Sequence, residues 1–427
     1  MVIRIKKDKR KRWIFCALYY YMFTGVFMNL LHMPRSIIYA GDIINLYLFL
    51  NILYVLPHRR RYSGALDNWL MLFIVGTVIG LLLNLSIESI IMYVWGARNN
   101  FRFFIFFYAC ILFLEKKDID RVLKTLNVIF CINTLVYIYE WSVLKVYGDF
   151  LGGIFGITQG CNGRLNLFLC VVCCYNLLQY FQNRIKIWKV AVIIALSLGM
   201  AVVSELKVFF FEIVIIMVLI MAMNGVSVKT IIVTIGGVFA LSMAITMINS
   251  MYDYSRISVD GTGNIFSPIN IVHYLTKRSG YNGYGTDLNR FTAAFQINES
   301  FFRGQLDKQL FGIGLGGADY SGIPMFVSRF YKEYAFLHYQ WFQYAWLFLE
   351  TGVVGLISYI MIVITIMWKA LHLNDRFFTY KALTVVVCVL VMISLLYNIS
   401  MRVESSAYLM FMLLATPFIC EKEQKLE

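Results

Sequence analysis

The sequence predicts an all-α, polytopic integral membrane protein with about 12 transmembrane helices and one large extracytoplasmic loop. Three observations lead to this fold class. Hydrophobic residues make up 60% of the chain and charged residues only 15%, and the mean hydropathy is +0.70. Apolar runs recur along the chain, and Lys and Arg gather in the short segments between them. A soluble protein of 427 residues has too little interior to bury so much apolar surface, whereas a bilayer can solvate it.

The apolar runs define the expected spans, because a helix needs about 20 largely apolar residues to cross a bilayer. The expected spans are residues 13–31, 37–56, 68–86, 101–114, 122–144, 164–182, 187–204, 206–223, 229–249, 350–368, 382–400 and 405–420. The runs 101–114 and 405–420 are short. Residues 1–12 are strongly basic and precede a long apolar run, which predicts a cytoplasmic tail ahead of a retained signal-anchor helix.

The distribution of basic residues predicts the orientation. When residues 1–12 are placed in the cytoplasm, 23 of the 38 Lys and Arg residues fall in cytoplasmic segments and seven in short outer segments. The other eight lie in the long segment 250–338, which carries little weight in the positive-inside rule. We therefore expect nine helices over 13–249, an extracytoplasmic loop over 250–338, a re-entry segment and three helices over 339–420, and a cytoplasmic tail over 421–427.

Net charge and cysteine content exclude two other classes. The net charge of +14 comes with no basic stripe interleaved with exposed aromatic residues, so nucleic acid is not an expected partner. Eight of the nine cysteines lie within or beside apolar runs, which predicts packing residues rather than a disulfide framework. The group Cys170, Cys173 and Cys174 is expected to pack inside a membrane helix rather than to bind a metal.

Segment 250–338 has the composition of a soluble loop, since it is rich in Tyr, Gly, Asn and Ser and nearly balanced in charge. The apolar spacing of residues 287–303 predicts a helix that lies on the membrane surface. The glycine-rich segment 310–324 predicts a tight turn. A glycine-rich phosphate-binding loop would follow a strand of a βαβ unit, and this segment does not.

Basic residues near the outer helix ends are candidates for binding an anion, most simply a phosphate or diphosphate, because a guanidinium suits phosphate oxygens. The set consists of Arg98, Arg102, Arg164, Lys207, Arg290 and Arg402. The alternative for each is snorkelling, in which a basic side chain reaches lipid headgroups. Snorkelling is the favoured interpretation for Arg98, Arg102 and Arg402. For Lys207, which lies close to Glu205, the alternative is an ion pair that holds a tight hairpin.

His338 opens the aromatic segment that leads back into the membrane, so it is expected near the bilayer surface. A histidine there can act as a general base, because its pKa is ordinarily near neutrality. The alternative is an interfacial histidine that donates to a backbone carbonyl. The outer loop has no His, Asp and Glu cluster with metal-ligand character, and no Ser-His-Asp arrangement is evident. Any catalysis is therefore expected to need neither a metal nor a cofactor.

Several segments, in this order, carry a resemblance to a known family. They are GRLNLFL (163–169), SELKVFFFEI (204–213), LNRFTAAFQI (288–297), QLFGIGLGGADYS (309–321) and HYQWFQYAWLFLETGVVGLISY (338–359). Together with the layout of helices around one long outer loop, they resemble the O-antigen polymerase and O-antigen ligase superfamily of bacteria. The sequence departs from the family pattern at Tyr339, where the family usually has Asn after its His.

The resemblance implies a metal-independent glycosyltransferase in the bacterial cytoplasmic membrane. Its substrate would be an oligosaccharide repeat unit on a polyprenyl diphosphate carrier, and a flippase and a chain-length regulator would be candidate partners. The reaction would polymerise repeat units into O-antigen or capsular polysaccharide, with inversion at the anomeric carbon. Arg290, supported by Arg164 and Lys207, would bind the diphosphate, and His338 would act as the base or orient the acceptor hydroxyl.

Three other functions remain open from the sequence. A ligase of the same superfamily would transfer finished polymer to an acceptor. A polysaccharide transporter or flippase would show paired, Gly/Pro-interrupted segments in its two halves, and none is evident. A non-enzymatic scaffold of a glycan assembly complex would need no catalytic residue at all.

Overall fold

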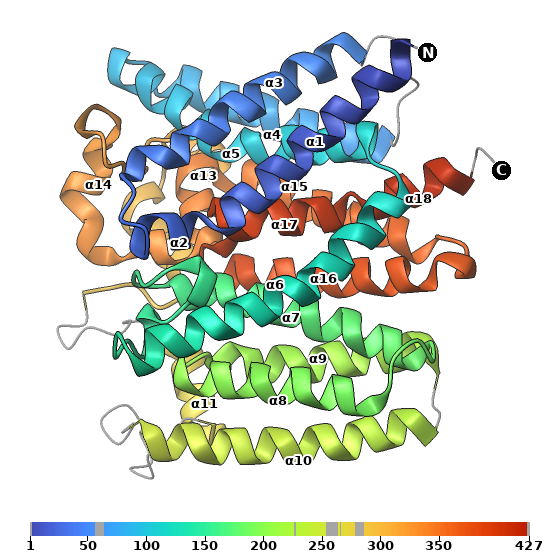
Figure 1. Cartoon of the computed structure of the whole chain (residues 1–427). Coiled ribbons are helices and arrows are strands. Elements are labelled where there is room, and N and C mark those ends of the chain that lie inside the picture. The colour runs from blue at the N-terminus through green and yellow to red at the C-terminus, as the bar shows by residue number, and fades with distance from the viewer. Residues whose placement is uncertain are drawn as a thin grey trace.

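The computed structural model describes residues 2–55, 64–225, 228–252, 264, 266–277 and 286–424, and over these residues the chain is helical without a β-sheet. The helices are α1 (Val2–Met22), α2 (Thr24–Asn29), α3 (Ala40–Val55), α4 (Gly64–Leu83), α5 (Ile87–Phe113), α6 (Lys116–Ser142), α7 (Cys161–Phe181), α8 (Ile187–Val203), α9 (Lys207–Asn224), α10 (Val228–Met251), α11 (Pro268–Thr276), α12 (Ala293–Ile297), α13 (Leu306–Phe311), α14 (Arg329–Tyr334), α15 (Gln343–Leu371), α16 (Phe378–Tyr397), α17 (Glu404–Leu414) and α18 (Thr416–Gln424). The long helices form one bundle (Figure 1).

Eight segments of the described chain are long and apolar enough to cross a membrane. They are Arg35–Val55, Gly64–Leu83, Lys116–Ser142, Cys161–Phe181, Lys207–Asn224, Val233–Met251, Gln343–Leu371 and Asp375–Tyr397. The prediction of an α-helical membrane protein is therefore confirmed. Of the other expected spans, α8 is apolar but has only 17 residues, and α17 has only 11. The expected spans 13–31 and 101–114, which fall in α1 and α2 and in α5, are not among the eight.

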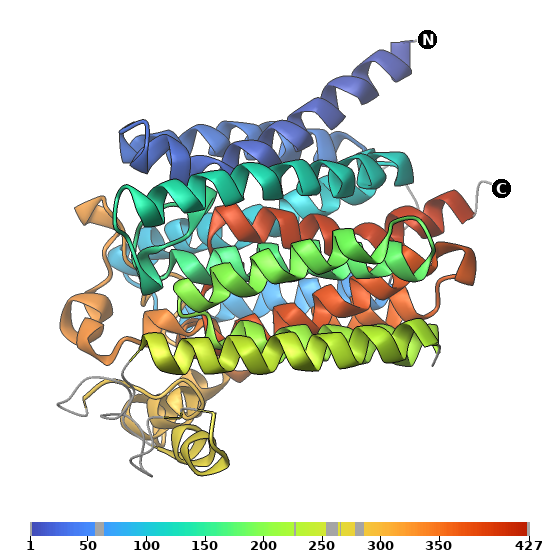
Figure 2. The ribbon, with the colours of Figure 1, turned by 60° about the horizontal axis from the view of Figure 1, so that its bottom comes forward.

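The two ends of the bundle differ in what they carry. The N- and C-termini lie at one end, together with the end of α9 and the start of α10 (Figure 1). The short helices α2, α11, α13 and α14 lie at the opposite end, which is called the loop end below (Figures 1 and 2). The chain between α10 and α15 thus contributes its described short helices to the end of the bundle away from both termini.

Burial distinguishes helices packed inside the protein from helices at its edge. In the span Cys161–Phe181, 89% of the most apolar 18-residue stretch is buried inside the protein. In Val233–Met251, only 17% of the corresponding stretch is buried. The edge helix α10 exposes large apolar side chains, namely Ile235, Val238, Phe239, Met243 and Met247. Because apolar side chains on such a face need an apolar solvent, this face of α10 is suited to contact lipid.

The surface helix expected over residues 287–303 is shorter than predicted. It comprises α12 and the π-helical turn Asn298–Phe302 that follows it. Asn289 explains why the helix does not begin earlier, since its side-chain oxygen accepts the backbone N–H of Phe291 at 2.9 Å. Its amide nitrogen donates to the carbonyl of Tyr274 at 2.9 Å. Such local side-chain bonds favour a turn over a helix.

The glycine-rich segment forms the expected tight turn, and it packs directly against membrane helices. Gly312, Gly314 and Gly316 have φ values of 70°, 94° and 81°, which favour glycine. At Gly316, a Cβ atom would lie 1.9 Å from the carbonyl oxygen of Met92 in α5. The turn can therefore approach the helix backbone only because these positions lack side chains.

The substitution Gly316→Ala should destabilise the protein by roughly 2–4 kcal/mol, because the left-handed conformation and the overpacking each add a cost. The melting temperature of the purified protein in detergent measures this effect. Gly322→Ala is the matched control, since a Cβ there meets nothing within 4 Å. Equal melting temperatures for the two variants would contradict the close packing of the turn.

Candidate functional site

The site residues expected from the sequence lie at the loop end, which contains the turn between α16 and α17 (residues 398–403, the α16–α17 turn). The backbone N–H of Gln343, at the start of α15, donates to the carbonyl of Asn398 at 3.1 Å. Gly163, in the first turn of α7, packs so closely that a Cβ there would lie 3.0 Å from Asn398 Nδ2 and from Ser400 Oγ. The α16–α17 turn therefore holds the starts of α7 and α15 together.

Arg290 lies in the loop segment before α12, and aromatic rings surround its half-buried guanidinium. Its Cζ is 3.9 Å from the ring centroid of Tyr397, at the end of α16. The ring centroids of Tyr274 and Phe342 are each 5.7 Å away. A cation over an aromatic face is attracted by the ring quadrupole, so these rings orient the guanidinium beside the α16–α17 turn.

Arg164 follows Gly163 in the first turn of α7. Its Nη2 donates to Thr158 Oγ1 at 3.0 Å. The half-buried guanidinium also interacts electrostatically with Glu404 and Tyr320. Gly163 contacts the α16–α17 turn, and Arg290 packs on Tyr397 directly before that turn. The fold therefore brings Arg164 and Arg290, which lie far apart in the sequence, to the same turn.

Lys207 forms an ion pair with Glu205, which was the alternative to its binding an anion. Its Nζ lies 2.8 Å from Glu205 Oε1, and Glu205 has a φ of 56°, as expected in a tight hairpin between α8 and α9. The hairpin contacts α7, since Asn162 Nδ2 donates to the carbonyl of Ser204 at 3.0 Å. Lys207 therefore lies near the start of α7, with its charge offset by Glu205.

His338 lies in the turn that precedes α15, with a φ of 54°. This conformation costs a residue other than glycine about 1–2 kcal/mol. Its ring stacks on Trp341, with centroids 3.9 Å apart. Within the described residues, His338 Nδ1 has no hydrogen-bond partner, so it makes no bond to a carbonyl through this atom. The carbonyl of Leu337 accepts the N–H of Leu288 at 3.0 Å, which joins the His338 segment to the Arg290 segment.

Tyr339, the residue after His338, has a structural role. Its side chain is fully buried, and its hydroxyl donates to the carbonyl of Ala318 at 2.7 Å. The ring also packs edge-on against Phe330, with centroids 5.4 Å apart. Tyr339 therefore anchors the glycine-rich turn to the segment that precedes α15.

Arg402 is buried in an ionic network, so the interpretation of this residue as a snorkelling side chain is wrong. Its Nη2 lies 2.8 Å from Asp319 Oδ1, and its Nη1 donates to Glu350 Oε2 at 3.3 Å. Its guanidinium stacks over the ring of Trp346 at 3.7 Å. Burial by itself lowers the pKa of Arg402, but the carboxylates of Asp319 and Glu350 outweigh it and leave this pKa above its usual value.

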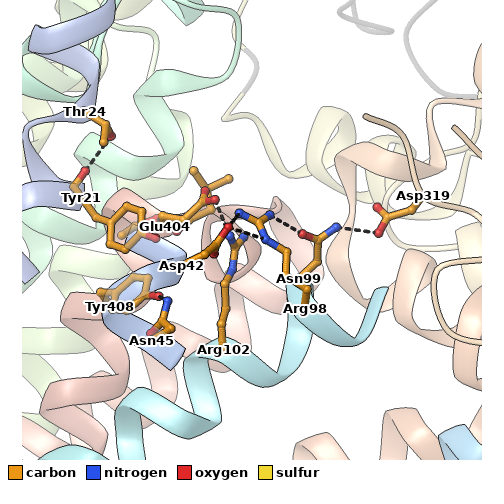
Figure 3. A network of polar contacts seen from close by, with 12 residues as sticks. Tyr21, Thr24, Asp42, Asn45, Arg98, Asn99, Arg102, Asp319, Glu404 and Tyr408 are labelled. Atoms are coloured by element: carbon orange, nitrogen blue, oxygen red, sulfur yellow. Dashed lines mark hydrogen bonds and ion pairs between the residues drawn. The ribbon is translucent and has the colours of Figure 1, made fainter. Parts of the chain in front are cut away.

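The network continues into α5 and α3 (Figure 3). Asn99 Nδ2 donates to Asp319 Oδ2 at 2.8 Å, and Arg98 Nη1 donates to Asn99 Oδ1 at 2.7 Å. Arg98 also pairs with Asp42 at 2.7 Å. Arg98 is therefore held by a carboxylate of a neighbouring helix, which corrects its interpretation as a residue that reaches lipid headgroups.

Arg102 forms a second branch of the network and is only 5% exposed. Its Nη1 lies 2.5 Å from Glu404 Oε1, at the start of α17 (Figure 3). Beneath this pair, Tyr408 accepts a hydrogen bond from Asn45 and stacks on Tyr21 with ring centroids 4.4 Å apart. Snorkelling is therefore wrong for Arg102 too, and the network links α1, α3, α5 and α17.

The substitution Arg402→Ala should lower the stability of the protein by about 3–5 kcal/mol, because it leaves two buried carboxyl groups without their partner. The measurement is again the melting temperature in detergent. Arg329→Ala is the control, since its side chain is 81% exposed and solvent screens its ion pair with Glu333. A melting temperature unchanged by Arg402→Ala would contradict the burial of this network.

Two observations concern metals and thiols. Within the described residues, no group of three or more His, Cys, Asp or Glu side chains could hold a metal ion. All nine cysteines have free thiols, and Cys170, Cys173 and Cys174 are buried inside α7. The cysteine cluster therefore packs within the bundle, as its apolar surroundings predict.

No protein-family model matches this sequence, and no curated protein matches it at a significant level. A functional assignment therefore depends on the residues at the loop end and on their geometry.

Proposed function

We propose that this protein polymerises polyprenyl-diphosphate-linked oligosaccharide repeat units into O-antigen or capsular polysaccharide. In this proposal the chain crosses the bacterial cytoplasmic membrane about 12 times, with both termini in the cytoplasm. The loop end then faces outward, where the lipid-linked substrates are presented.

The observation that carries the proposal is the convergence of Arg164, Arg290 and the His338 segment at the α16–α17 turn. Arg290 packs on Tyr397, which ends α16, and the residue before Arg164 packs on Asn398 and Ser400. Two guanidinium groups at one turn suit a diphosphate, because arginine offers several donors in a planar fork. The ion pair of Lys207 with Glu205 gives that residue a supporting role only.

The proposed reaction needs three groups. The acceptor hydroxyl attacks the anomeric carbon of the donor, and its proton passes to the ring of His338. The bond between the anomeric carbon and the diphosphate oxygen breaks, with inversion, and the bonding electrons remain on the diphosphate. Arg290 and Arg164 stabilise the charge that develops there. Holding two lipid-anchored substrates side by side supplies a further large part of the rate.

The size profile of lipid-linked glycans in cells that lack the protein tests this proposal. We expect single repeat units to accumulate on the outer-leaflet carrier, with no polymer. Full-length polymer that remains on the carrier would instead identify a ligase. Repeat units that stay on the cytoplasmic side would identify a transporter and would overturn the proposed catalytic roles.

A further inference from the structure

Tyr320 is held at the loop end by the residue that precedes it. Asp319 is only 2% exposed, and it pairs with Arg402 and accepts a hydrogen bond from Asn99. The carbonyl of Asp319 also accepts the N–H of Ser328 at 3.0 Å. The backbone at Tyr320 therefore has a defined position relative to α5 and to the α16–α17 turn.

Aromatic stacking also restricts the ring of Tyr320. Its centroid lies 5.3 Å from that of Tyr331 and 5.8 Å from that of Trp346, with interplanar angles of 26° and 29°. Trp346 itself lies under the guanidinium of Arg402. Stacked aromatic pairs are favourable beyond the apolar area that they bury, so they restrict the phenol ring to one orientation.

The hydroxyl of Tyr320 belongs to the same group of charges as Arg164. Tyr320 interacts electrostatically with Arg402 and Glu404, and Arg164 interacts with both Glu404 and Tyr320. Tyr320 nevertheless remains 45% exposed. A phenol ordinarily has a pKa of about 10, so the hydroxyl of Tyr320 carries its proton at neutral pH and can donate it in a hydrogen bond. Burial, with a further contribution from Asp319, raises this pKa further.

We propose that Tyr320 contacts the substrate and that its hydroxyl donates a hydrogen bond to the diphosphate beside Arg164. This inference rests on the proposed function, since it names one more residue of the same site. A neutral, ordered donor suits a leaving diphosphate, because it stabilises the developing negative charge without adding a cation to a region that already holds several. No pattern in the sequence distinguishes this tyrosine from the others, since the chain has 28 of them.

Binding of farnesyl diphosphate to the purified full-length protein in detergent tests the inference by calorimetry. The variant Tyr320→Phe removes only the hydroxyl and keeps the stacked ring. We expect it to raise the Kd about 10-fold to 100-fold, the range for a hydrogen bond to a charged group. The control Tyr331→Phe removes a hydroxyl from the adjacent ring of the same stack, and its Kd should stay within about twofold of wild type.

The possible outcomes separate this inference from the proposed function. If the wild type and Tyr320→Phe bind farnesyl diphosphate equally well, Tyr320 is not a ligand-binding residue, while the proposed function stands. An equal loss of affinity in Tyr331→Phe would assign the effect to the aromatic stack and would also overturn the inference. A wild-type protein that does not bind farnesyl diphosphate at all would contradict the proposed diphosphate site itself.

A second measurement covers the case in which Tyr320→Phe is unstable. Iodination of exposed tyrosines in the wild-type protein, followed by mass spectrometry of peptides, reports on Tyr320 directly. Farnesyl diphosphate should protect Tyr320, and it should not protect Tyr147, which is similarly exposed at 50%. Equal labelling of Tyr320 with and without the diphosphate would overturn the inference.

Discussion

Cells that carry Arg290→Ala should form about 100-fold to 1,000-fold less polymer, because removal of one donor to a developing oxyanion costs about that factor in rate. Single repeat units should accumulate on the lipid carrier at the same time. The measurement is gel electrophoresis of the polymer together with mass spectrometry of the lipid-linked glycans. The surrounding rings of Tyr397, Tyr274 and Phe342 hold the guanidinium in place, so the effect should exceed that of losing a mobile surface charge.

Two further variants isolate the reason for the loss. Arg290→Lys keeps the charge but not the planar fork or its stacking, and we expect an intermediate yield. Arg329→Ala removes an arginine that is 81% exposed and lies in the same loop, so its yield should match wild type. Normal polymer from Arg290→Ala, at a normal protein level, would show that this residue does not bind the leaving group.

The variant His338→Gln should lower the rate of polymerisation about 100-fold to 10,000-fold, which is the usual contribution of a positioned general base. Glutamine retains hydrogen-bonding atoms but cannot accept the acceptor's proton. An assay of the purified protein with lipid-linked repeat units extracted from the deletion strain measures this effect. Nδ1 of His338 is buried and has no hydrogen-bond partner among the described residues, so no protein group holds the ring through this atom.

His372→Gln is a close control for this variant. His372 is also paired with a tryptophan ring, Trp368, with centroids 4.5 Å apart. It follows α15, whereas His338 precedes α15, so the two histidines lie at opposite ends of that helix. We expect unchanged activity in His372→Gln. Similar losses in both variants would point to a general effect on folding, and full activity in His338→Gln would remove the base from the proposed mechanism.

The helices of this protein could be predicted because lipid-facing and buried spans share one property, namely a long apolar run. One segment of the loop shows the limits of that signal. Residues 287–303 have helical apolar spacing, yet Asn289 bonds to Phe291 and Tyr274 and delays the helix. The single sequence does not show which local side-chain bond will compete with the helix.

The candidate site was predictable in part. Basic residues near the ends of apolar runs are visible in the sequence. Arg290 packs on Tyr397 at the end of α16, and Gly163, the residue before Arg164, packs on the turn that follows. The segment of His338 is joined to that of Arg290 through Leu337 and Leu288. Their partners are not visible, because Arg102 and Glu404 are 302 residues apart, and Arg402 and Glu350 are 52 apart. Acidic residues near the ends of apolar runs, such as Asp42, could have indicated that the arginines there form ion pairs rather than reach lipid headgroups.

The ionic network also has a consequence for biosynthesis. The ribosome makes Arg102, Asp319 and Glu350 before it makes their partners Arg402 and Glu404. Until the end of α16 and the start of α17 emerge, Arg102 lacks Glu404, and Asp319 and Glu350 lack Arg402. Burying these charged groups before their ion-pair partners are present would be costly. The loop end can therefore complete its packing only when the final helices have been inserted, so assembly of this end depends on the last part of the chain to be translated.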